Sequence, residues 1–110
     1  MKVRELVEKY GLTVVAGQGG LDREIRCGYS GDLLSEVMGN AGVGCVWLTV
    51  QAHQNIVAVA VLREMAAIVI TGGGTPSPET MDKANSENIP VLTYPGNAFD
   101  LSGKLYVECQ

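Results

Sequence analysis

Apolar and polar residues follow two kinds of pattern along this chain, one helical and one extended. In the first segment, residues 2–12, the apolar positions recur at helical spacing, and Gly11 is a typical helix stop. The apolar stripe of this predicted helix consists of Val3, Leu6, Val7 and Tyr10. Two short extended runs follow at 12–17 and 25–29, joined by a glycine-rich turn. They predict either a hairpin or two strands of a larger sheet.

Three later segments are nearly continuous apolar runs, at residues 45–51, 67–71 and 90–94. Such runs are typical of strands that are covered on both faces of a sheet. Each run is followed by a helical pattern, and the repeat of about 22 residues matches strand–helix–strand crossover units, which build parallel sheets. The chain is therefore predicted to have an α/β fold with a small, mostly parallel sheet.

Two of the helices are predicted in the middle of the chain. For the helix near residues 33–38, Ser30 or Asp32 is the candidate N-cap. Its apolar face comprises Leu33, Leu34, Val37 and Met38. Residues 53–66 are interpreted as a well-buried helix because of their length, although the valines in this segment also suit a strand.

The last two predicted helices follow the second and third apolar runs. Ser77 is a good N-cap and Pro78 suits the first helical position, so a helix is expected to start there. Residues 97–108 predict a closing helix. Four of its large side chains are expected to be available for the core: Phe99, Leu101, Leu105 and Tyr106.

The length and composition indicate the number of domains and the kind of partner that the chain can bind. The length of 110 residues predicts one domain, residues 1–110, with enough core to need no metal or disulfide support. Only 18% of residues are charged, which predicts that some apolar surface is covered, with a homodimer as the expected arrangement and an isolated domain as the alternative. The net charge of −4, with only eight Lys and Arg, excludes the basic surface that nucleic-acid binding needs.

The cysteines, the N-terminal segment and the longest apolar run argue against a metal site, a signal peptide and a membrane span. Cys27, Cys45 and Cys109 have no CxxC spacing, and with His53 as the single histidine they predict no metal site. Cys45 is expected in the core and Cys109 on the surface. No cofactor motif is present. The N-terminal segment lacks the apolar stretch of a signal peptide, and the longest apolar run, 56–62, is too short to cross a membrane. A cytoplasmic protein is expected.

Candidate binding residues are expected outside the carboxyl ends of the three buried strands, where ligands gather in open α/β sheets. The segments there are polar but almost uncharged, which suits a neutral or weakly anionic small molecule better than a metal or a magnesium-bound polyphosphate. The candidate ligand-binding residues are Gln51, His53, Asn55, Thr71, Gly72, Gly73 and Asp100, together with Asp32 from the segment before the first of these strands.

The stretch TGGGTPSPE, residues 71–79, raises the question of a phosphate-binding loop. It lacks the lysine of the GxxxxGK[ST] pattern, and it departs from the dinucleotide pattern GxGxxG. Glu79 lies in the first turn of the next predicted helix, where a carboxylate opposes anion binding. Two interpretations remain: the glycines supply positive φ angles for a tight turn, or they admit a ligand to the backbone.

His53 carries the enzymatic alternative. It is the single histidine, a side-chain type often used as a general base, and it follows a predicted strand, where a general base is expected, with Asp100 or Asp32 as an orienting carboxylate. Both carboxylates lie near predicted helix starts, where capping also accounts for them. No serine or cysteine nucleophile is paired with His53 in the sequence, so catalysis is the weaker hypothesis.

The order of the segments resembles the DRTGG-domain family over nearly the whole chain. The likeness is carried by GLDREIRCGYSGDLLSEVMGNA and by the stretch from VWLTVQ to SGKLY. Its most specific parts are IVITGG with a proline shortly after it, AxxxxIPVL, and an aspartate in the closing helix. Asp32 and 71–73 match residues that give the family its name. Gly74, and the absence of a threonine in YPGNAFDLS, depart from what many relatives carry.

This resemblance implies a compact three-layer α/β/α domain. DRTGG domains are regulatory or dimer-forming inserts in phosphotransacetylases and CBS-domain pyrophosphatases, and they are similar to the N-terminal domain of HPr kinase/phosphorylase. A non-catalytic regulatory and dimerisation module, sensing a small molecule or nucleotide, is therefore expected. Kinase activity is not expected, because no phosphate loop is present. The alternative is a scaffold docking on a larger enzyme, with hydrogenase components as one partner class and residues 54–66 or a sheet edge as the contact.

Overall fold

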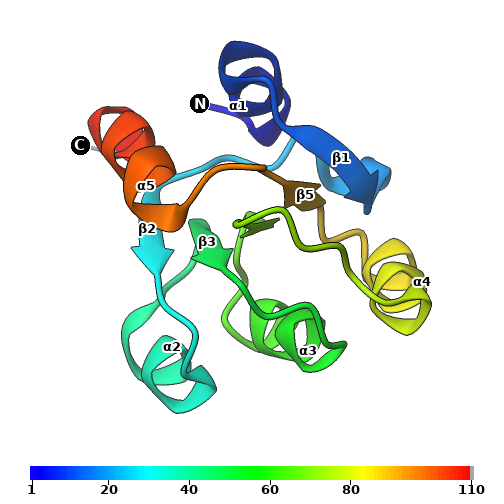
Figure 1. Cartoon of the computed structure of the whole chain (residues 1–110). Helices are drawn as coiled ribbons and strands as arrows, with labels where there is room; N and C mark the ends of the chain where they lie inside the picture. The colour runs from blue at the N-terminus through cyan, green and yellow to red at the C-terminus, as the bar shows by residue number, and fades with distance from the viewer. Residues whose placement is uncertain (110) are drawn as a thin grey trace.

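The computed structural model describes residues 1–109 and shows a five-stranded sheet with helices on both faces (Figure 1). The strands lie in the order β1-β5-β4-β3-β2. Strands β2, β3, β4 and β5 run parallel to one another, and β1 pairs antiparallel with β5. The strands are β1 (Thr13–Ala16), β2 (Cys27–Ser30), β3 (Cys45–Thr49), β4 (Ala67–Ile70) and β5 (Val91–Thr93). The prediction of a mostly parallel sheet is confirmed.

The helices form the two outer layers of the predicted α/β/α arrangement. They are α1 (Val3–Tyr10), α2 (Leu34–Asn40), α3 (Asn55–Leu62), α4 (Pro78–Glu87) and α5 (Ala98–Tyr106), with short 3-10 turns at Gln18–Gly20 and Val107–Cys109. Helices α2, α3 and α4 cover one face of the sheet, and α1 and α5 cover the other (Figure 1). None of the helices in residues 1–109 combines the length and apolar character that a membrane crossing requires.

Strand β3 shows how the pleat builds two cores from one continuous apolar run. Its five residues are all buried. Cys45 and Trp47 pack in the core beneath α2, α3 and α4, whereas Val46 and Leu48 pack in the core beneath α1 and α5. Successive residues of a strand point to opposite faces, so a central strand needs apolar residues at every position.

The first two strands do not form a hairpin, because β1 and β2 lie at opposite edges of the sheet. The segment between them passes beside α1, where Arg4 N donates to Leu21 O (2.8 Å) and Val3 N donates to Arg23 O (3.0 Å). Of the two alternatives that the sequence leaves open, membership of a larger sheet is correct.

The predicted ends of two helices are confirmed. Gly11 closes α1 in the left-handed region, with φ of 65°. Ser77 caps α4 by accepting a hydrogen bond from Thr80 N at 3.3 Å, and Pro78 occupies the first position. The predicted cap of α2 is wrong. Leu33 stands at the N-cap position without a side-chain cap, and Asp32 instead binds the segment after β3.

Helix α5 buries fewer large side chains than predicted. Leu101 and Leu105 are buried one turn apart, but Phe99 is 90% exposed and Tyr106 is 67% exposed. Residues two positions before and one position after a buried helical residue point well away from it, because each residue turns the helix by about 100°. Cys109 is also partly buried rather than on the open surface.

Helix α3 is correctly predicted as a helix despite its valines, but it is only partly buried. Ile56, Val57, Val59 and Ala60 pack in the core, whereas Leu62 is 69% exposed. The apolar character of this segment therefore extends from the core face onto the surface.

Candidate functional site

Hydrogen bonds join the three loops that follow β3, β4 and β5. Thr71 N donates to Thr49 O at 2.9 Å, which ties the end of β4 to the end of β3. Gly72 N donates to Gly96 O at 2.7 Å, which ties the same loop to the segment after β5. The structure thus brings the loops of the candidate residues Gln51, Thr71, Gly72 and Gly73 to one edge of the sheet.

Asp32 links the segment after β2 to this edge. Its Oδ1 atom accepts hydrogen bonds from Thr49 Oγ1 and from Val50 N, both at 2.8 Å. Gln51 Nε2 donates to the backbone carbonyl oxygen of Asp32 at 3.1 Å. Asp32 and Gln51, both predicted as site residues, therefore contact each other in a latch between two loops.

Thr49 is the residue of this latch that the sequence interpretation missed. Its side chain is buried, donates to Asp32 Oδ1, and accepts a hydrogen bond from Gln51 N at 3.1 Å. A buried polar group keeps its place only when it is hydrogen-bonded. A threonine at the end of an otherwise apolar strand is the sequence signal that points to such a partner.

The glycine loop is a turn in which the backbone N–H groups of Gly72 and Gly73 are already hydrogen-bonded. Gly72 and Gly73 have φ angles of 80° and 82°, a region that favours glycine. Gly72 N donates to Gly96 O, and Gly73 N donates to Tyr94 O at 3.4 Å. A phosphate cradle needs such N–H groups to point at the anion. The turn interpretation accounts for both glycines, and the two N–H groups are not presented to a phosphate.

Asp100 lies in a second polar cluster, with a tyrosine and a lysine. Tyr94 OH donates to Asp100 Oδ2 at 2.6 Å, and Lys104 Nζ donates to Tyr94 OH at 3.1 Å. The helix cap predicted for Asp100 is instead supplied by Asn97, whose Oδ1 accepts from Asp100 N at 2.8 Å. The hydrogen bond from Tyr94, together with the charge of Lys104, holds the pKa of Asp100 below its usual value.

We expect the Asp100→Asn variant to be less stable than wild type at neutral pH, and we expect this difference in stability to shrink in acid. A carboxylate whose pKa is lowered by folding stabilises the fold above its unfolded pKa, about 4, and that contribution is lost as pH falls through the folded pKa. The difference in urea midpoint between wild type and Asp100→Asn should therefore be larger at pH 7 than at pH 3. Asp82→Asn, on the exposed side of α4, is the matched control. An Asp100→Asn deficit of equal size at both pH values would contradict the assignment.

His53 and Asn55 are exposed and take no part in these clusters. Neither side chain hydrogen-bonds to another residue in the range 1–109, and His53 contributes its carbonyl oxygen to Ile56 N at 3.1 Å. Within the same range, no hydrogen bond or ion pair links His53 to Asp32 or Asp100. The structure therefore does not assemble the histidine–carboxylate pair of the enzymatic hypothesis.

Exposed apolar side chains accompany the polar loops, which the sequence interpretation did not foresee. Leu33 before α2, Val50 after β3 and Phe99 at the start of α5 all lie where the parallel strands end, and all are more than half exposed. An apolar surface next to hydrogen-bonding loops is typical of a ligand or partner site.

The comparisons with known proteins agree with this fold. The family model of the DRTGG domain matches residues 31–106. Comparison with curated proteins gives no significant match. A solved structure of the CBS and DRTGG domains of the regulatory region of Clostridium perfringens pyrophosphatase, complexed with the activator diadenosine tetraphosphate, matches with a TM-score of 0.71 and 17% identity. The match covers 93% of this chain and 44% of that one, so the chain spans less than half of the neighbour's length. The chain belongs to the DRTGG domain family.

Proposed function

We propose that this chain is a non-catalytic regulatory module that forms a homodimer and senses a small molecule or nucleotide at the carboxyl ends of its parallel strands. The observation that carries the proposal is the connected hydrogen-bond chain from Asp32 through Thr49 and Thr71 to the loop after β5. A ligand that contacts one of these loops acts on all of them, because they share their hydrogen bonds.

A nucleotide suits the groups at this edge of the sheet. Phe99 is 90% exposed, and aromatic rings are stacking surfaces for bases. The ammonium group of Lys104 lies beside Tyr94 and Asp100, near the N-terminal end of α5 that also carries Phe99. The neighbouring pyrophosphatase region was solved with the nucleotide activator diadenosine tetraphosphate, which supports the same ligand class for a regulatory DRTGG module.

The non-catalytic part of the proposal rests on the isolation of His53. A general base needs an orienting partner and a nucleophile or substrate proton within hydrogen-bond reach. His53 is exposed and stands apart from Asp32 and Asp100 among the described residues. The carboxylates are engaged by Thr49 and Tyr94, in contacts that stabilise loops.

A scaffold that docks on a larger enzyme is the second candidate, and one surface favours it. On α3, Leu62 is 69% exposed and Val61 is 38% exposed, at the end of a helix that is apolar on both sides. A protein partner or a second copy of the chain that covers these residues removes apolar surface from water.

The test is thermal unfolding against a panel that contains ATP, AMP, diadenosine tetraphosphate and acetyl phosphate. A ligand at a hundredfold excess over its dissociation constant stabilises by about 2.7 kcal/mol, which raises the midpoint of a domain of this size by about 10 °C. Gly73→Val, which alters the glycine turn, should lose the shift, each variant being compared with its own ligand-free midpoint. His53→Ala tests whether the exposed histidine contacts the ligand.

The control is Gly39→Ala in α2, where an added Cβ meets open space, so this variant should keep the full shift. Light scattering after size exclusion measures the dimer directly. A monomer at micromolar concentration with no shift from any compound would overturn the proposal. A dimer with no shift would favour the scaffold.

A further inference from the structure

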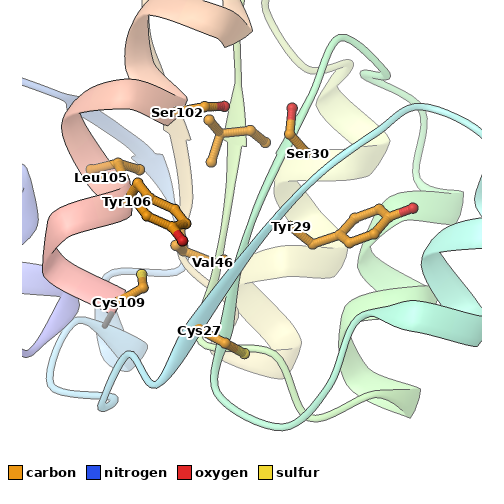
Figure 2. A pocket seen from close by; sticks show the side chains of 10 residues that line it. Cys27, Tyr29, Ser30, Val46, Ser102, Leu105, Tyr106 and Cys109 are labelled. Atoms are coloured by element: carbon orange, nitrogen blue, oxygen red, sulfur yellow. The ribbon is translucent and has the colours of Figure 1, made fainter.

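A cavity of about 310 Å³ opens between β2 and α5 (Figure 2). Strand β2 is the edge of the sheet here, and α5 lies across the face of β2 and β3. The residues that define the cavity are Gly28 and Ser30 of β2, Val46 and Leu48 of β3, and Ser102 and Tyr106 of α5. Its volume falls within the range of small-molecule sites, about 300–1,000 Å³.

The cavity exists because β2 supplies only small residues on this face. Gly28 lies opposite Val46, and Ser30 lies opposite Leu48, so neither fills the space beside the two β3 side chains. The larger residue Tyr29 of β2 points away from α5, and it packs with the other core (Figure 2). A Cβ atom built on Gly28 would lie 3.7 Å from both Cys109 Sγ and Val46 Cγ1, so the room there accepts a side chain without displacing the backbone.

Among the described residues 1–109, the lining combines an apolar floor with free hydroxyl groups and carries no charged side chain. None of the lining residues in that range is Asp, Glu, Lys or Arg. Val46, Leu48 and Leu105 form the floor. Figure 2 shows the hydroxyls of Ser30 and Ser102 at one end of the cavity. Neither these hydroxyls nor that of Tyr106 hydrogen-bonds to another of the described residues 1–109.

We propose that this cavity binds an uncharged, mainly apolar small molecule, of the size of one or two fused aromatic rings, with a hydroxyl or amide group directed to Ser30 and Ser102. A charged ligand would lose its hydration without gaining a partner among these residues. An apolar ring packs against the partly buried Cys27 and Cys109, because Val46 and Leu48 beneath them are already 0% and 3% exposed. Its polar group satisfies hydroxyls that otherwise bind water. The residues that line this cavity are not those of the loop site in the proposed function, and the inference stands without that function.

The second copy of a dimer paired through β2 is a poor occupant of the cavity. Residues directly opposite each other in an antiparallel pair point to the same face. On this face the second copy brings the same small residues, Gly28 and Ser30, which leaves the space between β2 and α5 unfilled. The geometry therefore favours a separate small molecule.

The experiment is titration of the full chain with 2-naphthol, followed by amide NMR shifts, with 2-naphthoate as the charged counterpart. We expect saturable shifts at Gly28, Ser30 and Ser102 with 2-naphthol, and none with 2-naphthoate. Gly28→Val places a β-branched side chain in the cavity at a position that suits a strand, and it should weaken binding at least tenfold. Gly103→Ala on α5, where an added Cβ meets open space, should bind as wild type does.

Three results would overturn the proposal. One is the absence of saturable shifts at these amides. Another is equal affinity of wild type and Gly28→Val, because a ligand in this cavity cannot coexist with a filled cavity. The third is concentration-dependent broadening of the β2 and α5 signals without any probe, which would show that a second copy covers this face. The shift in thermal midpoint that nucleotides cause should also be measured in Gly28→Val. A variant that loses 2-naphthol binding but keeps the nucleotide shift distinguishes the cavity from the loop site.

Discussion

The Gly17→Ala variant is expected to lose about 3 kcal/mol or more of its free energy of unfolding, the largest effect expected for an alanine substitution at a glycine of this chain. A Cβ on Gly17 would lie 1.9 Å from Ile89 O and 2.3 Å from the carbonyl carbon of the same residue. The φ angle of Gly17 is 72°, a region that costs other residues about 1–2 kcal/mol, and overpacking against backbone adds about 1–3 kcal/mol. Urea unfolding followed by circular dichroism measures the loss.

Two companion variants keep this prediction testable if Gly17→Ala does not fold. Asn85→Ala removes the Oδ1 atom that accepts from Gly17 N at 2.7 Å, and it should cost about 1–3 kcal/mol because it leaves that N–H unpaired. Gly103→Ala, in the interior of α5 with open space around it, should instead stabilise by about 0.5–1 kcal/mol. A Gly17→Ala protein as stable as wild type would mean that the turn does not pack against Ile89.

The same close approach explains which part of the fold the sequence predicts and which it leaves open. The three strand–helix units are local patterns, so their periodicity alone predicts them. The placement of β1 depends on contacts far along the chain: Gly17 against Ile89, and Gly20 against Asn88 O. Nothing in residues 12–29 marks those partners, so the hairpin and the larger sheet were equally compatible with the sequence.

The candidate site also has a part that the sequence predicts and a part that it does not. The rule that ligands gather at the carboxyl ends of parallel strands places Gln51 and Thr71 correctly, because their loops do meet there. The sequence offers Asp32 both as a candidate helix cap and as a candidate ligand-binding residue, because capping is the usual local use of aspartate before a helix. Its actual partner, Thr49, is seventeen residues away, and a contact of that range follows from strand pairing rather than from local sequence.

Surface exposure was the property that sequence predicted least well. Phe99 is apolar and lies in the first turn of a helix in which Leu101 and Leu105 are buried, so the pattern alone assigns it to the core. Its position is instead set by Asn97, which caps α5 and fixes the rotation of the first turn. With Leu101 turned inward, Phe99 points outward. An aromatic ring held in this way is available to a ligand or a partner, which the sequence pattern does not distinguish from a core residue.

Trp47→Ala is expected to cost about 3–5 kcal/mol, a large part of the about 5–15 kcal/mol by which a domain is usually stable. Trp47 is fully buried on β3, and its Nε1 donates to Gly31 O at 2.9 Å. The loss combines the cavity left by the indole with an unpaired carbonyl group. Because Trp47 is the only tryptophan, circular dichroism rather than intrinsic tryptophan fluorescence should follow unfolding.

Trp47→Phe separates the two parts of that loss and connects the core to the site. It keeps an aromatic ring but leaves Gly31 O without its donor, which should cost about 1–3 kcal/mol. Phe99→Ala, an aromatic truncation at an exposed position, should change stability by no more than about 0.5 kcal/mol. Equal losses in Trp47→Phe and Trp47→Ala would show that packing of the ring contributes little beyond its hydrogen bond.

Trp47→Phe should also affect the candidate site. Since Gly31 directly precedes Asp32, the substitution should weaken the hydrogen bond between Asp32 and Thr49. The ligand-induced shift in the thermal midpoint should therefore fall, in a protein that remains folded.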